Sequence, residues 1–157
     1  MAQADLIILN HEEIRRRSIK LWMGIPEKFY HWQPDPDAMS LIEIVRHVLE
    51  SEYIYGKIVE GRGVMGENFV SPWEGRPYTN VEDELAFSKP YRESYFEMIN
   101  SFTEQDLSKI EIIRIERGQR RKLGDYLLRI AYHEAIHSGN VLAYLRTLEI
   151  DRPNIWD

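Results

Sequence analysis

Cysteine is absent from the 157-residue sequence. Its absence excludes a disulfide-stapled scaffold, a zinc ribbon with cysteine ligands, an iron–sulfur cluster and a cysteine nucleophile. It is also compatible with a reducing compartment. Any thiol chemistry performed by this protein therefore needs a thiol from another molecule.

Basic residues and long apolar runs are also scarce. The 20 Lys and Arg residues are outnumbered by 26 Asp and Glu residues, which gives a net charge of -6. This charge opposes binding to nucleic acid or to an anionic membrane surface. No run approaches the roughly 18 apolar residues of a membrane-spanning helix, and residues 1–10 lack the basic start of a signal peptide. We therefore expect a cytoplasmic protein with neither a nucleic-acid partner nor a membrane partner.

The residues that are present match a single globular domain. With 43% hydrophobic and 29% charged residues and no internal repeat, we expect one domain over residues 1–157. Polar residues spaced three apart form capping pairs that predict the starts of three helices. These pairs are Asn10 with Glu13, Ser40 with Glu43, and Asn80 with Asp83.

Apolar residues at helical spacing predict how far four helices extend. The first ends before Gly24, the second at Gly61, the third near Ser101, and the fourth runs from Lys122 to Glu149. Pro90 predicts a kink in the third helix or a later start.

The connections between these helices differ in length. Residues 61–79 contain four Gly and two Pro, which predicts a long loop with Phe69 and Trp73 as aromatic anchors. Shorter features are a turn within 27–32, a turn at 103–106 and an extended or helical stretch at 113–116.

Four amphipathic helices with one doubtful strand predict an all-α fold, a four-helix bundle with a long loop between the second and third helices. We expect up-down connectivity between successive helices. An α+β domain is the alternative.

Three of the five histidines fall on the two strongest predicted helices. His133 and His137 are four residues apart, so they share one helix face with Cβ atoms about 5–6 Å apart. His47 lies on the helix that begins at Ser40 and is the third candidate ligand. Three imidazoles without cysteine suit zinc, nickel, copper or iron and leave a coordination position open, as in catalytic sites. The alternative is that these are hydrogen-bonded core histidines.

The segment from His133 to His137 also fits the H-E-x-x-H pattern of zinc proteases, in which Glu134 would be the general base. The extended form of that pattern needs Gly and His at positions where this chain has Asn140 and Ala143. A protease is therefore disfavoured. Glu134 is rotated about 100° from His133 on a helix, so we expect either an interhelical charge or a group that orients a ligand.

Three segments together resemble the DinB/YfiT-like family of metal-binding four-helix bundles: Trp32–Pro36, Ser40–His47 and His133–Asn140. The resemblance covers nearly the full chain and implies that His47, His133 and His137 converge on one divalent metal, usually zinc or nickel. It also implies a homodimer. The chain departs from the common family pattern after the histidine pair, where Ser138, Gly139 and Asn140 replace a basic residue, Gly and Gln.

The resemblance implies a metal-dependent transferase that uses a low-molecular-weight thiol, such as bacillithiol or mycothiol, against a small electrophile. Such an activity would serve detoxification or a stress response. A metal cation stabilises a bound thiolate, and the same position could instead activate water in a hydrolase. A non-catalytic metal-binding or dimeric interaction module is the third hypothesis.

Two further sets of residues are candidates for partner contacts. Basic runs usually form solvated faces, but the second run could contact an acidic partner or an anionic substrate; the runs are Arg15–Arg17 and Arg114, Arg117, Arg120, Arg121 and Lys122. Aromatic candidates for an interaction surface are Trp22, Trp32, Trp73, Tyr78 and Trp156.

Overall fold

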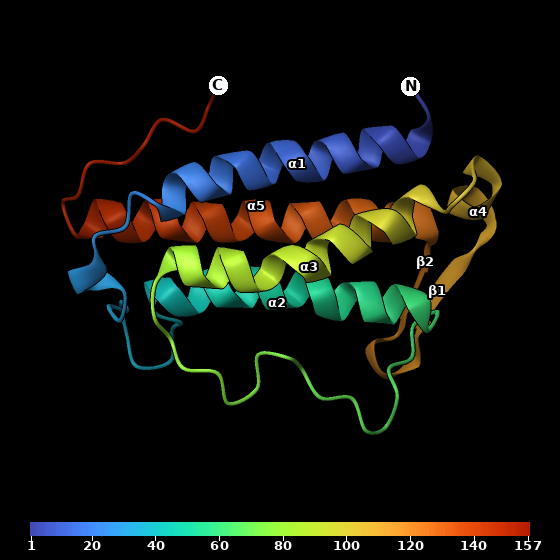
Figure 1. Ribbon diagram of the computed structural model, residues 1–157, viewed down its shortest axis with the longest axis horizontal. Helices are drawn as coiled ribbons and strands as arrows, with labels where there is room; N and C mark the ends of the chain where they lie inside the picture. Colours follow the sequence, from blue (N-terminus) through green and yellow to red (C-terminus); the bar gives the residue numbers. More distant parts are fainter.

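Four long helices lie side by side along one axis in the computed structural model, which describes residues 1–157 (Figure 1). They are α1 (Gln3–Trp22), α2 (Leu41–Glu60), α3 (Val81–Asn100) and α5 (Leu123–Thr147). Shorter elements are the 3-10 turns Glu27–Phe29 and Ile115–Arg117, helix α4 (Glu104–Lys109), and strands β1 (Glu111–Arg114) and β2 (Gln119–Lys122). The predicted four-helix bundle is confirmed, and the only sheet is a two-stranded hairpin.

The predicted caps of α2 and α3 are confirmed. The Ser40 backbone N–H donates to Glu43 Oε2 at 2.7 Å, and Asn80 Oδ1 accepts from the Asp83 backbone N–H at 2.8 Å. These contacts satisfy amide groups that have no partner within a helix. Helix α3 starts at Val81, so Pro90 does not delay it; Figure 1 shows α3 changing direction along its length, as expected for proline inside a helix.

The predicted start of the first helix at Asn10 is wrong, because α1 begins at Gln3. The Ala2 backbone N–H donates to Asp5 Oδ2 at 3.0 Å, which provides an earlier cap. Ala4 and Ile7 are buried in a core cluster. Tertiary burial therefore extends the helix upstream of the local capping signal at Asn10, which is an exposed residue within α1.

Helices α1 and α5 run parallel to each other, so the expected up-down connectivity is wrong (Figure 1). Ser18 and Ser138 are hydrogen-bonded at 3.1 Å, and Arg15 donates to Glu134 at 2.8 Å. Both pairs advance in the same direction along the two helices, as parallel packing requires.

Helices α2 and α3 are also parallel, because the long loop over residues 61–80 returns along the bundle before α3 begins (Figure 1). Arg46 pairs with Glu84 near the start of the two helices, and Glu52 pairs with Arg92 farther along. Loop closure costs little extra free energy as a loop lengthens, so a crossover of this length is tolerated.

The long loop is held against α2 and α3 by aromatic and charged contacts. Trp73 is buried in a core cluster, which confirms its predicted anchoring role. Phe69 stacks against Tyr53 with ring centroids 6.1 Å apart. Arg46 donates to the Pro77 carbonyl at 2.8 Å, and its guanidinium lies 3.7 Å from the Tyr78 ring centroid. The loop therefore packs on the helices.

The segment between α3 and α5 contains more structure than the sequence predicted. The predicted turn at 103–106 is the start of α4, where Thr103 and Asp106 form a reciprocal cap. The predicted extended or helical stretch at 113–116 is divided: its first half lies in β1, which pairs antiparallel with β2, and its second half lies in the 3-10 turn that follows. Strand β2 was not predicted, because its residues, Gln119–Lys122, show no apolar alternation.

The start of the long loop packs closely against β1. A Cβ at Gly63, where φ is +114°, would lie 1.9 Å from the Ile113 carbonyl oxygen, so only glycine allows this approach.

Two clusters of buried apolar side chains fill the bundle, one at each end. Trp22 and Trp73 belong to the first cluster, so they are core residues and not part of an interaction surface. Tyr78 and Trp156 are exposed. No helix combines the length and apolar character needed to cross a membrane.

Candidate metal centre

The three predicted histidines meet between α2 and α5. His133 Nε2 lies 3.1 Å from His47 Nε2 and 3.1 Å from His137 Nε2. One ring nitrogen from each residue falls within 4.8 Å of the others. All three side chains are half-buried, so the cluster faces the surface of the bundle.

The arrangement fits a divalent cation better than it fits three isolated imidazoles. Zinc–nitrogen bonds of about 2.0–2.1 Å at roughly tetrahedral angles place ligand nitrogens about 3.3 Å apart, close to the 3.1 Å separations here. A neutral imidazole carries one N–H, so three facing nitrogens cannot all be paired with one another. A cation would satisfy the three lone pairs together.

The electrostatics of the cluster favour neutral imidazoles, the form that binds metal. Burial lowers the pKa of all three histidines. For His133, burial and the neighbouring His137 and His47 lower the pKa to about 4. The three side chains are therefore uncharged at neutral pH and need no deprotonation before a metal binds.

This pKa shift predicts how acid affects the metal-free protein. The pKa of His133 is about 4 in the folded state against 6.5 for an ordinary histidine, so the unfolded chain binds more protons between these values. The free energy of unfolding should therefore fall as the pH decreases from 6.5 towards 4. Urea denaturation at a series of pH values measures this change.

Two variants test whether His133 causes this fall in the free energy of unfolding. His133→Gln should show a smaller loss of stability between pH 6.5 and 4.5, whereas His31→Gln, which changes an exposed histidine, should behave like the parent. Carboxylates contribute mainly below about pH 4.5. A parent protein with constant stability across this range would contradict the assignment of depressed histidine pKa values.

Aromatic side chains line the same face of the bundle on both sides of the cluster. The Tyr55 ring lies edge-on to His133, with centroids 5.6 Å apart, and the Arg129 guanidinium is 5.9 Å from the Tyr55 centroid. Farther along α5, Tyr144 packs edge-on against Trp32 at 5.4 Å. The cluster therefore lies between a tyrosine–arginine wall and a tyrosine–tryptophan wall.

Glu134 lies away from the histidines, as its helix rotation predicted. Its carboxylate is buried and accepts two hydrogen bonds from Arg15 of α1, at 2.8 and 2.9 Å. Burial alone would raise the pKa of Glu134, but Arg15 keeps it below its ordinary value. The interpretation as an interhelical charge is confirmed, and the base required by the H-E-x-x-H protease mechanism is not available here.

A buried charge network around Arg15 was not predicted from the sequence. Arg15 also lies 3.5 Å from Glu52 of α2, and Glu52 pairs with Arg92 of α3. Arg92 donates to the His11 carbonyl at 3.0 Å. These side chains come from all four long helices when Glu134 is included. Arg15 sits in a run of three arginines, and only the helix packing separates this buried member from Arg16 and Arg17.

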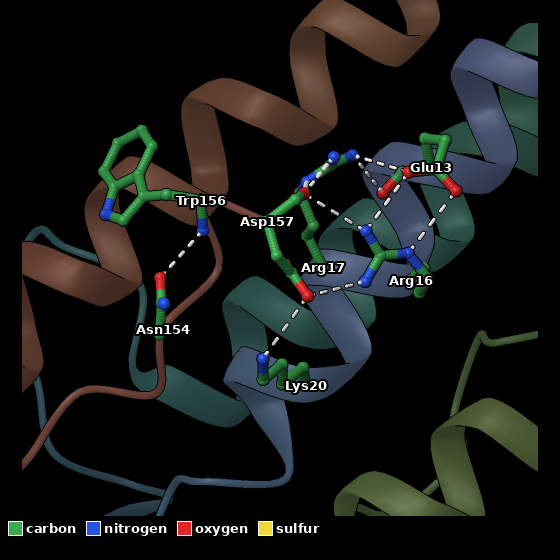
Figure 2. Close-up of polar contacts among 7 residues, drawn as sticks. All are labelled: Glu13, Arg16, Arg17, Lys20, Asn154, Trp156 and Asp157. Atoms are coloured by element: carbon green, nitrogen blue, oxygen red, sulfur yellow. Dashed lines mark hydrogen bonds and ion pairs between the residues drawn. The ribbon is translucent and has the colours of Figure 1, made fainter.

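The other members of the first basic run contact the end of the chain (Figure 2). Arg16 donates to Asp157 Oδ2 at 3.2 Å, and Arg17 donates to the Asp157 backbone oxygen at 3.0 Å. Residues of the second basic run pair with nearby acids, including Glu111, Glu116 and Asp125. Ion pairs and hydrogen bonds within the protein thus account for most of the basic residues that the sequence singled out.

The fold and the cluster together define a class: a four-helix bundle with parallel helix pairs and three histidines contributed by its second and fourth long helices. The model of the DinB superfamily matches residues 10–141. The chain belongs to the DinB superfamily, and the resemblance stated from the histidine segments is confirmed.

Similar proteins come from Bacillus species. The chain is 26% identical over 149 residues to the uncharacterized protein YjoA of Bacillus subtilis, covering 94% of this chain and 92% of that protein. The crystal structure of the DinB-like YjoA superposes with a TM-score of 0.68 at 21% identity, covering 95% of this chain and 96% of YjoA.

A second solved structure is YfiT of B. subtilis, described as a probable metal-dependent hydrolase with an unusual four-helix bundle topology. It has a TM-score of 0.73 at 13% identity, with 94% of this chain and 89% of YfiT covered. A DinB-like protein of Bacillus cereus gives a TM-score of 0.70 at 13% identity, with 96% and 95% covered. At these identities the likeness shows a shared fold.

Proposed function

We propose that this protein is a metal-dependent S-transferase that joins a low-molecular-weight thiol to a small electrophile, with His47, His133 and His137 holding a zinc or nickel ion. The observation that carries the proposal is the convergence of three neutral imidazole nitrogens at a half-buried, accessible position. A divalent cation bound there would supply charge that lowers the pKa of a bound thiol.

The surroundings favour a thiol over water as the nucleophile. The nearest acidic side chain on α5, Glu134, is held by Arg15, and Glu50 of α2 makes no ion pair. No carboxylate oxygen joins the three histidine nitrogens in the cluster, so a general base is not built into it. A thiol has a pKa near 8.5 and water one of about 15.7, so a thiol ionises with far less assistance.

The transfer itself requires no oxidant or reductant. The thiol proton leaves to solvent, the sulfur forms a bond to the electrophilic carbon, and the leaving group departs with its bonding electron pair. The half-buried histidines orient the reacting sulfur, and the aromatic walls formed by Tyr55 and Trp32 limit access by water. We place this activity in the cytoplasm, in detoxification or a stress response.

A metal-dependent hydrolase is the second candidate. YfiT, which shares this fold, is described as a probable metal-dependent hydrolase. The same open coordination position could activate water, but no carboxylate oxygen joins the histidine nitrogens as a general base, which makes this the weaker proposal. A non-catalytic dimeric module is the third, and light scattering of the purified protein would determine whether it is a homodimer.

A direct assay separates these proposals. Protein loaded with zinc or nickel should accelerate the conjugation of 1-chloro-2,4-dinitrobenzene with at least one thiol among bacillithiol, mycothiol, coenzyme A and cysteine. We expect the metal-free protein and His47→Ala to lose this rate by at least about hundredfold, since one ligand or the ion is missing. The measurement is the absorbance of the conjugate.

The controls assign each outcome to one hypothesis. His31→Ala removes an exposed histidine outside the cluster and should retain the rate. Hydrolysis of p-nitrophenyl acetate without thiol, in the absence of any conjugation, would favour the hydrolase. If fully metal-loaded protein catalyses neither reaction, the result supports the third hypothesis, a non-catalytic binding module.

A further inference from the structure

Arg129 is a half-buried arginine that has no acidic partner. Its guanidinium instead contacts an aromatic ring, that of Tyr55. The nearest acid on the same helix, Asp125, is engaged by Arg121 at 2.9 Å. Every other buried or half-buried arginine pairs with a carboxylate: Arg15 with Glu134, Arg17 with Glu13, Arg46 with Glu84, Arg76 with Asp83, Arg92 with Glu52, Arg114 with Glu116, and Arg121 with Asp125.

This uncompensated cation lies beside the histidine cluster. Arg129 precedes His133 by four residues on α5, so the two share one helix face with Cβ atoms about 5–6 Å apart. The Tyr55 ring is near both, with its centroid 5.9 Å from the guanidinium and 5.6 Å from the His133 ring centroid.

An anion bound beside Arg129 would offset two unfavourable effects on its charge. A guanidinium one helical turn from a site for a divalent cation adds like charge to like charge, and partial burial weakens its hydration. The face of Tyr55 offsets part of this cost through a cation–π contact. No acceptor of the protein bonds the guanidinium N–H groups of Arg129, and their planar fork matches a carboxylate.

We propose that Arg129 binds the carboxylate of the thiol substrate whose sulfur occupies the histidine site. This inference rests on the proposed function and adds the substrate class, a carboxylate-bearing thiol. One end of the molecule lies at the three histidines and the other forms a charge-assisted contact one helical turn away, with Tyr55 beneath it. Arg129 thereby selects anionic thiols over neutral ones of the same length.

Cobalt-substituted protein tests the inference by thiol binding alone. Co²⁺ gives visible absorption that reports occupancy of the histidine site, and a near-ultraviolet charge-transfer band that reports thiolate binding. The probes are 3-mercaptopropionate and the neutral 3-mercapto-1-propanol. We expect the parent to bind the carboxylate thiol about tenfold more tightly, at the low end for a hydrogen bond to a charged group.

Arg129→Gln should remove this preference while changing the affinity for the neutral thiol by less than about twofold, because only the distal contact is lost. Arg129→Lys should retain part of the preference, since the charge remains without the planar fork. Arg146→Gln, which changes an exposed arginine in the last turn of α5, is the matched control and should retain all of it. Comparing each variant with the parent cancels the intrinsic difference between the two thiols.

The outcomes separate this inference from the proposed function. A cobalt site that binds both thiols equally, or a preference that survives in Arg129→Gln, overturns the role of Arg129 alone. A protein that forms no cobalt site overturns the proposed function and this inference together. Circular dichroism and the visible cobalt spectrum of Arg129→Gln show whether that variant is folded and loaded, so loss of preference is not confused with loss of structure.

Discussion

Replacing either His47 or His137 by alanine should abolish stoichiometric metal binding. The parent should retain about one zinc or nickel ion per chain after reconstitution and dialysis, because ring nitrogens of three histidines from α2 and α5 lie within 4.8 Å of one another, a spacing that suits ligands of a single ion. Each variant keeps two imidazoles, and we expect its affinity to fall by more than about hundredfold. Metal analysis by mass spectrometry and calorimetric titration measure both quantities.

The two variants act on different helices, which makes the result specific to a shared site. His47 lies on α2 and His137 on α5, so equal losses from both require an ion that bridges the helices. His31→Ala should bind metal like the parent, since His31 is exposed and packs against Tyr78. A parent that takes up no metal under any condition would show that the histidines are core residues and would remove the basis for a metal-dependent reaction.

Removing Arg15 should produce the largest loss of stability from one substitution. Arg15→Met leaves the buried carboxylate of Glu134 without its two hydrogen bonds and deprives Glu52 of a second cation. An unpaired buried charge costs about 3–5 kcal/mol, a large fraction of the stability of a domain of this size. Urea denaturation at neutral pH measures the loss.

Two comparisons separate burial from charge. Arg16→Met removes an exposed arginine one residue away and should cost far less, because water screens its ion pairs. The double variant Arg15→Met with Glu134→Gln should recover part of the loss, because no uncompensated charge remains at that position. If Arg15→Met costs no more than Arg16→Met, the buried pair does not hold α1 against α5.

The pair of Arg15 and Glu134 also makes the free energy of unfolding depend on pH. Arg15 keeps the pKa of Glu134 below its ordinary value, so the pair stabilises the protein above the unfolded pKa of the carboxyl, and this contribution is lost as the pH falls below it. The histidine contribution is lost at higher pH, between 6.5 and 4. The two effects therefore separate along the pH axis.

Local sequence signals were sufficient where the relevant contacts are local. The caps at Ser40 and Asn80 involve residues three apart, and the helix face shared by His133 and His137 follows from helical geometry. The start of α1 was mispredicted because Ala4 and Ile7 are held in the helix by burial in the core, which the pair Asn10 and Glu13 does not report.

Non-local contacts decided the character of the charged residues. Arg15, Arg16 and Arg17 are chemically alike and adjacent, yet Arg15 is buried against Glu134 whereas Arg16 and Arg17 contact Asp157. The sequence does not identify Arg129 as a candidate binding residue, because it belongs to neither basic run. Its role follows from two contacts in the structure: its own contact with Tyr55, and the ion pair of Asp125 with Arg121.

Composition and residue spacing are enough to predict four amphipathic helices, the absence of cysteine chemistry, and an i,i+4 histidine pair with a third histidine on another helix. Periodicity and capping depend on neighbours within one or two turns, so they can be read from the chain directly. Three features follow only from the packing of the helices: α1 pairs in parallel with α5, His47 completes the cluster, and the Glu134 carboxylate is buried against Arg15. These outcomes depend on the direction in which each helix packs. The long crossover between α2 and α3 sets that direction, and no local sequence pattern encodes it.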